Sequence, residues 1–258
     1  MNRLQALDLP EIAPASSSKS LSPYNAQAIK IESGVFTRPK ADLPCAFFAP
    51  LHYEPNYAYP LLVWLHGPAD DENQLRRIMP LVSMRNYVGL SIRGTRAVTG
   101  NSGRRAFTWS ADAGHFEQAE ERLFDAIDLA RERFNIAPER VFIGGYDIGG
   151  TMAFRMALAH PRSFGGVLSI GGEFPSDDTP LRWLDAVRRL PMFLAYARDS
   201  QSFTMAQVCE TIRLFHIAKL KVNLFQYPCP QQLTTTMLED MDRWIMEQVT
   251  GVTATAVV

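Results

Sequence analysis

Asp147 stands in the middle of the pattern Gly-x-Asp-x-Gly, within the stretch VFIGGYDIGG at residues 141–150. The stretch is typical of a buried strand that runs through a tight turn, between Gly145 and Gly149, into a helix. When serine occupies the middle of such a turn, its hydroxyl is exposed as a nucleophile. A carboxylate does not replace that hydroxyl in forming an acyl intermediate from an ordinary ester, but it can attack an sp³ carbon.

A second interpretation of Asp147 is conformational. The middle residue of such a turn often has a positive φ, which Asp and Asn tolerate better than most residues. The N-terminus of the following helix also favours a negative charge. Aspartate is therefore a comfortable residue at this turn even if it takes part in no reaction.

Short apolar runs alternate with longer amphipathic stretches from about residue 28 onward. Runs that are apolar on both faces are typical of parallel strands covered by helices on each side. We predict one doubly wound α/β domain over residues 26–250, with a mostly parallel eight-stranded sheet, after a flexible arm at 1–25 and before a tail at 251–258. The predicted strands are 28–33, 45–50, 61–66, 87–93, 140–145, 166–171, 192–197 and 222–227, and the predicted helices include 115–135, 151–160, 204–220 and 238–249.

The overall composition is that of an ordinary globular protein. In 258 residues, 47% are hydrophobic and the net charge is −1, which gives no electrostatic reason to expect nucleic acid or a membrane surface as a partner. The sequence contains no apolar run of about 18 residues and no signal-peptide core. Its three widely spaced cysteines favour free thiols in a reducing compartment, so we expect a cytoplasmic location. We expect no cofactor and no metal, because no GxGxxG or metal-ligand spacing is present.

With these elements in place, the chain resembles the α/β-hydrolase superfamily, and within it the small esterases of the phospholipase/carboxylesterase branch. The likeness covers roughly residues 40 to 247. The fold it implies is the one predicted above, and the activity it implies is ester hydrolysis by a serine–histidine–acid triad. The stretches that carry it are YPLLVWLHGPADDEN, YVGLSIRGTR, the segment from IAPERVFIGGYDIGG to GGEFP, PMFLAYARDS and NLFQYPCPQQLTTTMLEDMDRWI.

The resemblance places Asp147 at the nucleophile position and Gln231, in YPCPQQL, at the histidine position. Glutamine does not exchange a proton near neutral pH, so it cannot act as a general base. The aspartate-nucleophile hydrolases, such as haloalkane dehalogenases and epoxide hydrolases, share the Gly-x-Asp-x-Gly turn and also require that histidine. Glutamine at this position therefore argues against both chemistries.

Among the five histidines, we consider only His115, at the start of a predicted helix, as a substitute base. His66 belongs to the His-Gly loop, where the resemblance implies a structural role. His160 is predicted to end a helix, His216 to lie within one, and His52 to lie near the opposite end of the sheet.

The remaining parts of the predicted site also depart from the esterase pattern. Asp199 or Ser200 occupies the acid position, with Asp199 one residue out of register. In related esterases, the residue after the His-Gly pair donates a backbone N–H to the oxyanion, and here that residue is Pro68, which has none. If the alignment slides by one residue, Ala69 takes this position instead. The N–H of Ile148 would be the second donor.

Several further side chains have structural interpretations. The acidic run DDEN at residues 70–73 is expected to cap the helix that follows it. Trp64 and Trp244 are expected in the core. Arginines 93, 96, 104 and 105 are expected in loops near the strand ends, where they could meet Asp147, an anionic ligand or solvent.

These observations lead to one hypothesis with two alternatives. The chain is expected to be similar to carboxylesterases but without esterase activity, and to act by binding a small molecule in the residual pocket or a partner. The alternatives are a hydrolase that uses Asp147 as its nucleophile and a weak esterase-like hydrolase.

Overall fold

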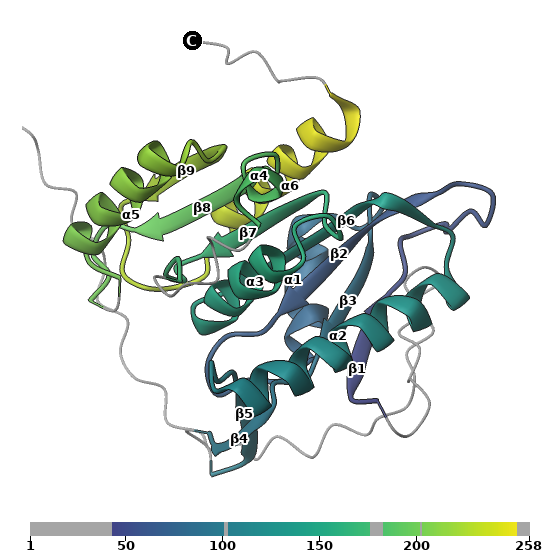
Figure 1. Ribbon diagram of the computed structural model, residues 1–258. Helices are drawn as coiled ribbons and strands as arrows, with labels where there is room; N and C mark the ends of the chain where they lie inside the picture. The colour runs from purple at the N-terminus through teal and green to yellow at the C-terminus, as the bar shows by residue number, and fades with distance from the viewer. Residues whose placement is uncertain (1–42, 101–102, 176–182, 202, 252–258) are drawn as a thin grey trace, which may run out of the picture. The chain divides into compact units, whose positions relative to one another are not determined.

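The computed structural model describes residues 43–100, 103–175, 183–201 and 203–251. The predicted arm, the predicted strand at 28–33 and most of the predicted tail lie outside these residues. The described part forms a mostly parallel α/β sheet with helices, together with a small antiparallel hairpin, as expected for the α/β-hydrolase fold (Figure 1).

The main sheet has seven strands among the described residues, in the order β1-β3-β2-β6-β7-β8-β9. Only β1 is antiparallel to its neighbour, and every other pair is parallel. The carboxyl ends of most strands therefore lie at the same end of the sheet, where side chains from several strands can meet. The strands of this sheet are β1 Cys45–Phe48, β2 Tyr59–Leu65, β3 Val88–Ile92, β6 Ile136–Tyr146, β7 Gly166–Ile170, β8 Met192–Ala197 and β9 Val222–Tyr227.

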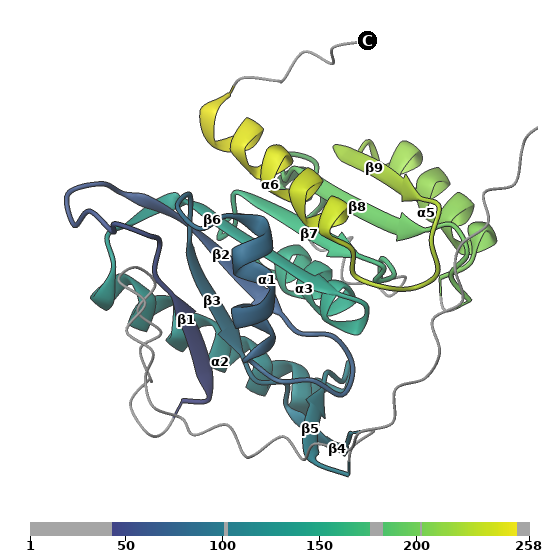
Figure 2. The ribbon, with the colours of Figure 1, turned by 180° about the vertical axis from the view of Figure 1, so that it is seen from behind.

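Helices cover both faces of the sheet. Figure 1 shows α2, α3 and α5 in front of it, and Figure 2, turned by 180°, shows α1 and α6 in front. The two hydrophobic clusters follow the same division, since one contains residues of α2, α3 and α5 and the other contains residues of α1 and α6. The helices are α1 Gln74–Val82, α2 Ala113–Arg133, α3 Ile148–Ala159, α4 Leu184–Val187, α5 Met205–Ala218 and α6 Thr235–Thr250.

The central strands are buried because both of their faces are covered. All seven residues of β2 are buried, including Trp64, and eight of the 12 residues of α3 are buried. Trp244 of α6 packs edge-on against Phe142 of β6. The prediction that both tryptophans belong to the core is confirmed.

One element was not predicted. Residues expected to form loops instead form an antiparallel hairpin, with β4 at Arg96–Thr99 and β5 at Arg105–Thr108. The N–H of Phe107 donates to the carbonyl of Asp70 at 2.8 Å, which joins the hairpin to the loop after β2. Arg96 and Arg105 therefore lie on strands, and the loop prediction for them is wrong.

Candidate functional site

The turn between β6 and α3 has an unusual backbone. Asp147 has φ 53° and ψ −125°, and α3 begins directly after it at Ile148. The turn is tight because α3 approaches β2 closely: a Cβ added at Gly149 would lie 2.3 Å from the carbonyl oxygen of Leu65, and one at Gly145 would lie 2.5 Å from Gly149. Glycine is thus required on both sides, and Asp147 is held in a conformation that favours glycine.

The side chain of Asp147 meets Gln231 at the tip of this turn. Gln231 Nε2 donates to Asp147 Oδ2 at 3.3 Å and to the carbonyl of Gly171 at 2.9 Å. The two residues are 84 positions apart in the sequence, and the two loops that follow β6 and β9 bring them together. The structure therefore pairs the residue at the predicted nucleophile position with the residue at the predicted histidine position.

Neither side chain of this pair is an imidazole, so the pair offers no histidine base. The amide of Gln231 is a donor through Nε2, and its Oε1 is buried without a hydrogen-bond partner among the described residues. All five histidines are described, and none forms a hydrogen bond with Asp147. His115 lies in the first turn of α2 and His216 within α5.

His160 and His66 have the structural positions that the sequence indicated. His160 is the C-cap of α3 and forms an ion pair with Glu120 of α2. His66 is fully buried below the loop after β2, where its Nε2 accepts the N–H of Gly94 at 2.9 Å and its Nδ1 donates to the carbonyl of Gly67 at 2.8 Å. Burial lowers the pKa of His66, which favours the neutral ring that this bonding pattern requires.

The loop after β2 carries the predicted oxyanion position. Pro68 is exposed and has no N–H, and Ala69 has a φ of 53°. The N–H of Gly67 is already bonded, at 3.2 Å, to Oε1 of Gln74, which also accepts the indole N–H of Trp64 at 2.7 Å. These hydrogen bonds hold the loop in place, and neither Gly67 nor Pro68 offers a free donor. The predicted donors that remain are Ile148 at the start of α3 and, under the shifted alignment, Ala69.

The acid position lies at the end of β8. The side chain of Asp199 is 53% exposed, and it pairs with Arg198 at 3.1 Å. Ser200 is buried, and its Oγ accepts the N–H of Phe203 at 3.0 Å. None of the hydrogen bonds found among the described residues joins either side chain to Gln231 or Asp147.

The run DDEN, in the loop after β2, supplies the N-cap residue of α1, as predicted. This residue is Asn73, and its side chain makes no capping hydrogen bond. Glu72 is instead buried and forms an ion pair with Arg93, while Asp70 pairs with Arg77. Arg93 is therefore engaged by Glu72, and not by Asp147. Hydrogen bonding to Glu72 raises the pKa of Arg93.

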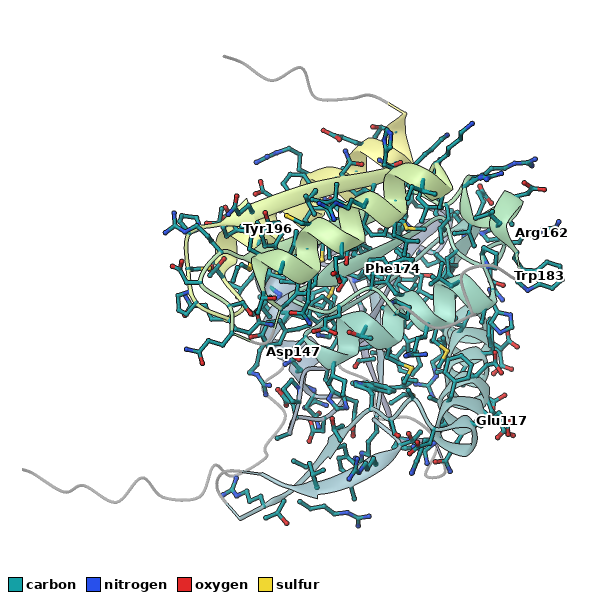
Figure 3. All side chains as sticks on the ribbon, turned by 60° about the vertical axis from the view of Figure 1, so that its left-hand side comes forward. Glu117, Asp147, Arg162, Phe174, Trp183 and Tyr196 are labelled. Carbon is teal, nitrogen blue, oxygen red and sulfur yellow. The ribbon has the colours of Figure 1, made fainter. Side chains whose placement is uncertain are left out.

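A separate groove of about 720 Å³ lies elsewhere on the chain, between α2, the end of α3 and the start of α4. Its lining includes Phe116, His160 and Trp183, but it does not include Asp147. Figure 3 shows Asp147 well apart from Arg162 and Trp183. The groove is thus distinct from the site at the turn.

Two further observations concern the described residues as a set. Among them, no three His, Cys, Asp or Glu side chains converge as metal ligands would. None of their helices combines the length and apolar character needed to cross a lipid bilayer.

Comparison with known proteins agrees with this fold. The family model for phospholipase/carboxylesterase proteins matches residues 57–248. The structure is similar to that of a Bacillus cereus carboxylesterase (TM-score 0.62, 19% identity, 81% of this chain and 95% of that one). It is also similar to that of Arabidopsis thaliana SOBER1 (TM-score 0.60, 18% identity, 74% of this chain and 100% of that one).

A curated relative also matches part of the sequence. The protein named "Putative esterase NocK", from Nocardia uniformis subsp. tsuyamanensis, is 28% identical over 130 residues, which are 48% of this chain. The match spans only 36% of the length of that relative.

Proposed function

This chain belongs to the phospholipase/carboxylesterase family of α/β-hydrolase proteins, and from that premise we propose that it does not hydrolyse esters and acts by binding a small molecule or a partner at the residual site. One observation carries the proposal: Asp147 accepts a hydrogen bond from Gln231 at the tip of the turn, where the family's reaction requires a hydroxyl and an imidazole.

The chemistry of these two side chains opposes ester hydrolysis at each step. Attack by the Asp147 carboxylate on an ester would give an anhydride, which is less stable than the ester it replaces. The negative charge that develops on the carbonyl oxygen would find no donor at Pro68, and the N–H of Gly67 is already bonded to Gln74. No imidazole is hydrogen-bonded to Asp147 to activate water in a second step. Loss of one catalytic residue of such a triad alone costs about 10⁴–10⁶ in rate.

The test is a rescue experiment. We expect the wild-type chain to release no p-nitrophenol from short p-nitrophenyl esters above the rate of a heat-unfolded sample. The double variant Asp147→Ser, Gln231→His should gain measurable turnover, because the backbone of the turn is already in place. Each single variant is the matched control and should stay inactive. Wild-type turnover that Asp147→Ala abolishes would contradict the proposal.

The half-buried carboxylate on a nucleophile turn supports the alternative of an Asp147-nucleophile hydrolase. An alkyl halide or epoxide would then form an ester with an oxygen of Asp147, releasing halide or opening the ring. Because Gln231 does not activate water, this ester should persist. After incubation with 1-bromobutane or styrene oxide, peptide mass spectrometry would show an adduct on Asp147 in the wild type and none at that position in Asp147→Asn. Alkylation of free thiols such as exposed Cys209 would appear in both proteins.

A further inference from the structure

The outer strand of the sheet, β9, has none of the features that usually protect an edge. It ends the strand order beside β8, and no other described strand pairs with it. Its sequence, VNLFQY, contains no charge and no proline, and its pairing with β8 is continuous from Val222 to Tyr227 without a bulge. Natural edges are usually blocked by charges, prolines or bulges, because open backbone groups pair with other chains.

The backbone groups that point outward can be assigned from those that point inward. The carbonyls of Lys221 and Tyr227 accept hydrogen bonds from the β8 side, at 2.9 and 2.8 Å. Because successive residues of a strand alternate in direction, the N–H and C=O groups of Val222, Leu224 and Gln226 face away from β8.

The helix beside this edge is weakly covered. Only Val208 and Phe215 of the 14 residues of α5 are buried. Figures 1 and 2 both show α5 and β9 side by side. Five of the eight large apolar residues that are exposed in the described chain lie on these two elements, and Ile217 is 77% exposed. These five are Met205, Ile212, Leu214, Ile217 and Leu224. A groove of about 450 Å³ lies between the two elements, and its lining includes Ile212, Phe215, Val222 and Leu224.

We propose that β9 pairs antiparallel with β9 of a second copy, about a twofold axis at Leu224. Val222 then exchanges backbone hydrogen bonds with the partner's Gln226, and Leu224 with the partner's Leu224, so every outward group in the strand finds a complement. Strand pairing alone buries less than the ~800 Å² per partner of a standard interface, and the apolar side chains of α5 beside the edge supply further surface.

The charges at the two ends of the edge favour this orientation. Lys221 lies just before β9, while Tyr227 at its end donates a hydrogen bond to Asp240 at 2.7 Å. The antiparallel register places Lys221 opposite the partner's Tyr227, so the two lysines lie at opposite ends of the interface. The Asp240 carboxylate beside Tyr227 is also paired with Arg243, at 2.8 Å, and adds no net charge there. A parallel pair would place the two lysines side by side, and like charges in direct opposition are destabilising.

The first test measures mass. Sedimentation of the full chain should give twice the monomer mass of 29.0 kDa. Leu224→Arg places two cations in opposition and should weaken the dimer by at least about tenfold, as should Ile212→Glu. The matched control is Leu81→Arg, at an exposed leucine on α1, which should leave the mass unchanged. A wild-type monomer at about 100 µM, or a dimer indifferent to both variants, overturns the proposal.

The second test fixes the register. In a hydrogen-bonded antiparallel pair, opposed Cα atoms lie about 5.5 Å apart, which a disulfide can span. In a Cys209→Ser background, Leu224→Cys should therefore form a disulfide-linked dimer on mild oxidation. Leu81→Cys in the same background should not. Absence of the link in Leu224→Cys, in a sample that sediments as a dimer, would place the interface elsewhere.

Discussion

The backbone of the turn at Asp147 and the side chains that meet at its tip are under very different constraints. The backbone is fixed by contacts that leave no room, such as the approach of Gly149 to the carbonyl of Leu65. The tip is held by one amide–carboxylate hydrogen bond of 3.3 Å between half-buried side chains. A similar difference separates Glu72, which is buried and paired with Arg93, from Asp199, which is exposed in the loop after β8.

The difference teaches that the shape of this turn does not depend on the reaction the family performs there. Close packing of α3 against β2 fixes the backbone, and it would do so with any residue at position 147 that tolerates a positive φ. The side chains at the tip make few contacts, so they can change without disturbing the sheet. Under the proposed function, the chain retains the backbone of this turn, while the side chains at its tip differ from those that the family's reaction requires.

The largest expected effect comes from a substitution that disturbs the backbone packing of the turn. Gly149→Ala would place a Cβ 2.3 Å from the carbonyl oxygen of Leu65 and 2.4 Å from that of His66. Neither oxygen can move without shifting β2, so we expect a loss of about 3 kcal/mol or more in the free energy of unfolding. Urea denaturation followed by tryptophan fluorescence measures it.

The matched control is Gly114→Ala, in the first turn of α2. A Cβ there meets no atom within 4 Å. Alanine forms helix better than glycine, so this variant should equal or exceed the wild type, by up to about 1 kcal/mol. Equal stability of the two alanine variants would show that packing does not fix the turn.

A smaller effect is expected at the tip. Asp147 has φ 53°, where a side chain is strained and glycine is not. Asp147→Gly should therefore be more stable than Asp147→Ala by about 1–2 kcal/mol, since both lose the bond to Gln231 and only alanine retains the strain. Asp147→Asn, which keeps an acceptor, should stay within about 0.5 kcal/mol of the wild type. Equal stabilities of the glycine and alanine variants would mean that the turn relaxes when its side chain is removed.

The sequence predicted most of the sheet because its strands are short, apolar and separated by turns. The family resemblance placed Asp147 at the nucleophile position and Gln231 at the histidine position, but it left open which side chain would lie beside Asp147. The fold followed from local patterns, whereas the hydrogen bond between two residues 84 positions apart came only from the structure.

Two features could not be predicted, for physical reasons. The β4–β5 hairpin has a mostly exposed first strand, Arg96–Thr99, which lacks the apolar alternation that marks a strand. Glu72 was predicted to belong to a helix-capping run. Its ion-pair partner Arg93 lies 21 residues away, just after β3, and the residues around Glu72 give no sign of this pairing. Long-range ion pairs leave no periodic signal in the sequence.

The smallest expected effect is a pH dependence of the free energy of unfolding that arises from buried His66. Burial lowers the pKa of His66 from its ordinary value of 6.5, so the unfolded chain binds a proton there at a pH where the folded chain does not. The contribution of His66 to the free energy of unfolding is therefore fully present above about pH 7.5. It is lost as the pH falls through 6.5 towards the pKa of His66 in the folded chain, with a slope of at most about 1.4 kcal/mol per pH unit. His66→Gln should lower stability at every pH, because the bonds to Gly67 and Gly94 change, but it should flatten the decline between about pH 7 and pH 5. Urea unfolding at several pH values separates the two effects, with His115→Gln as the control for removal of a histidine elsewhere. If the free energy of unfolding of His66→Gln falls as steeply with decreasing pH as that of the wild type, then protonation of His66 does not cause the pH dependence.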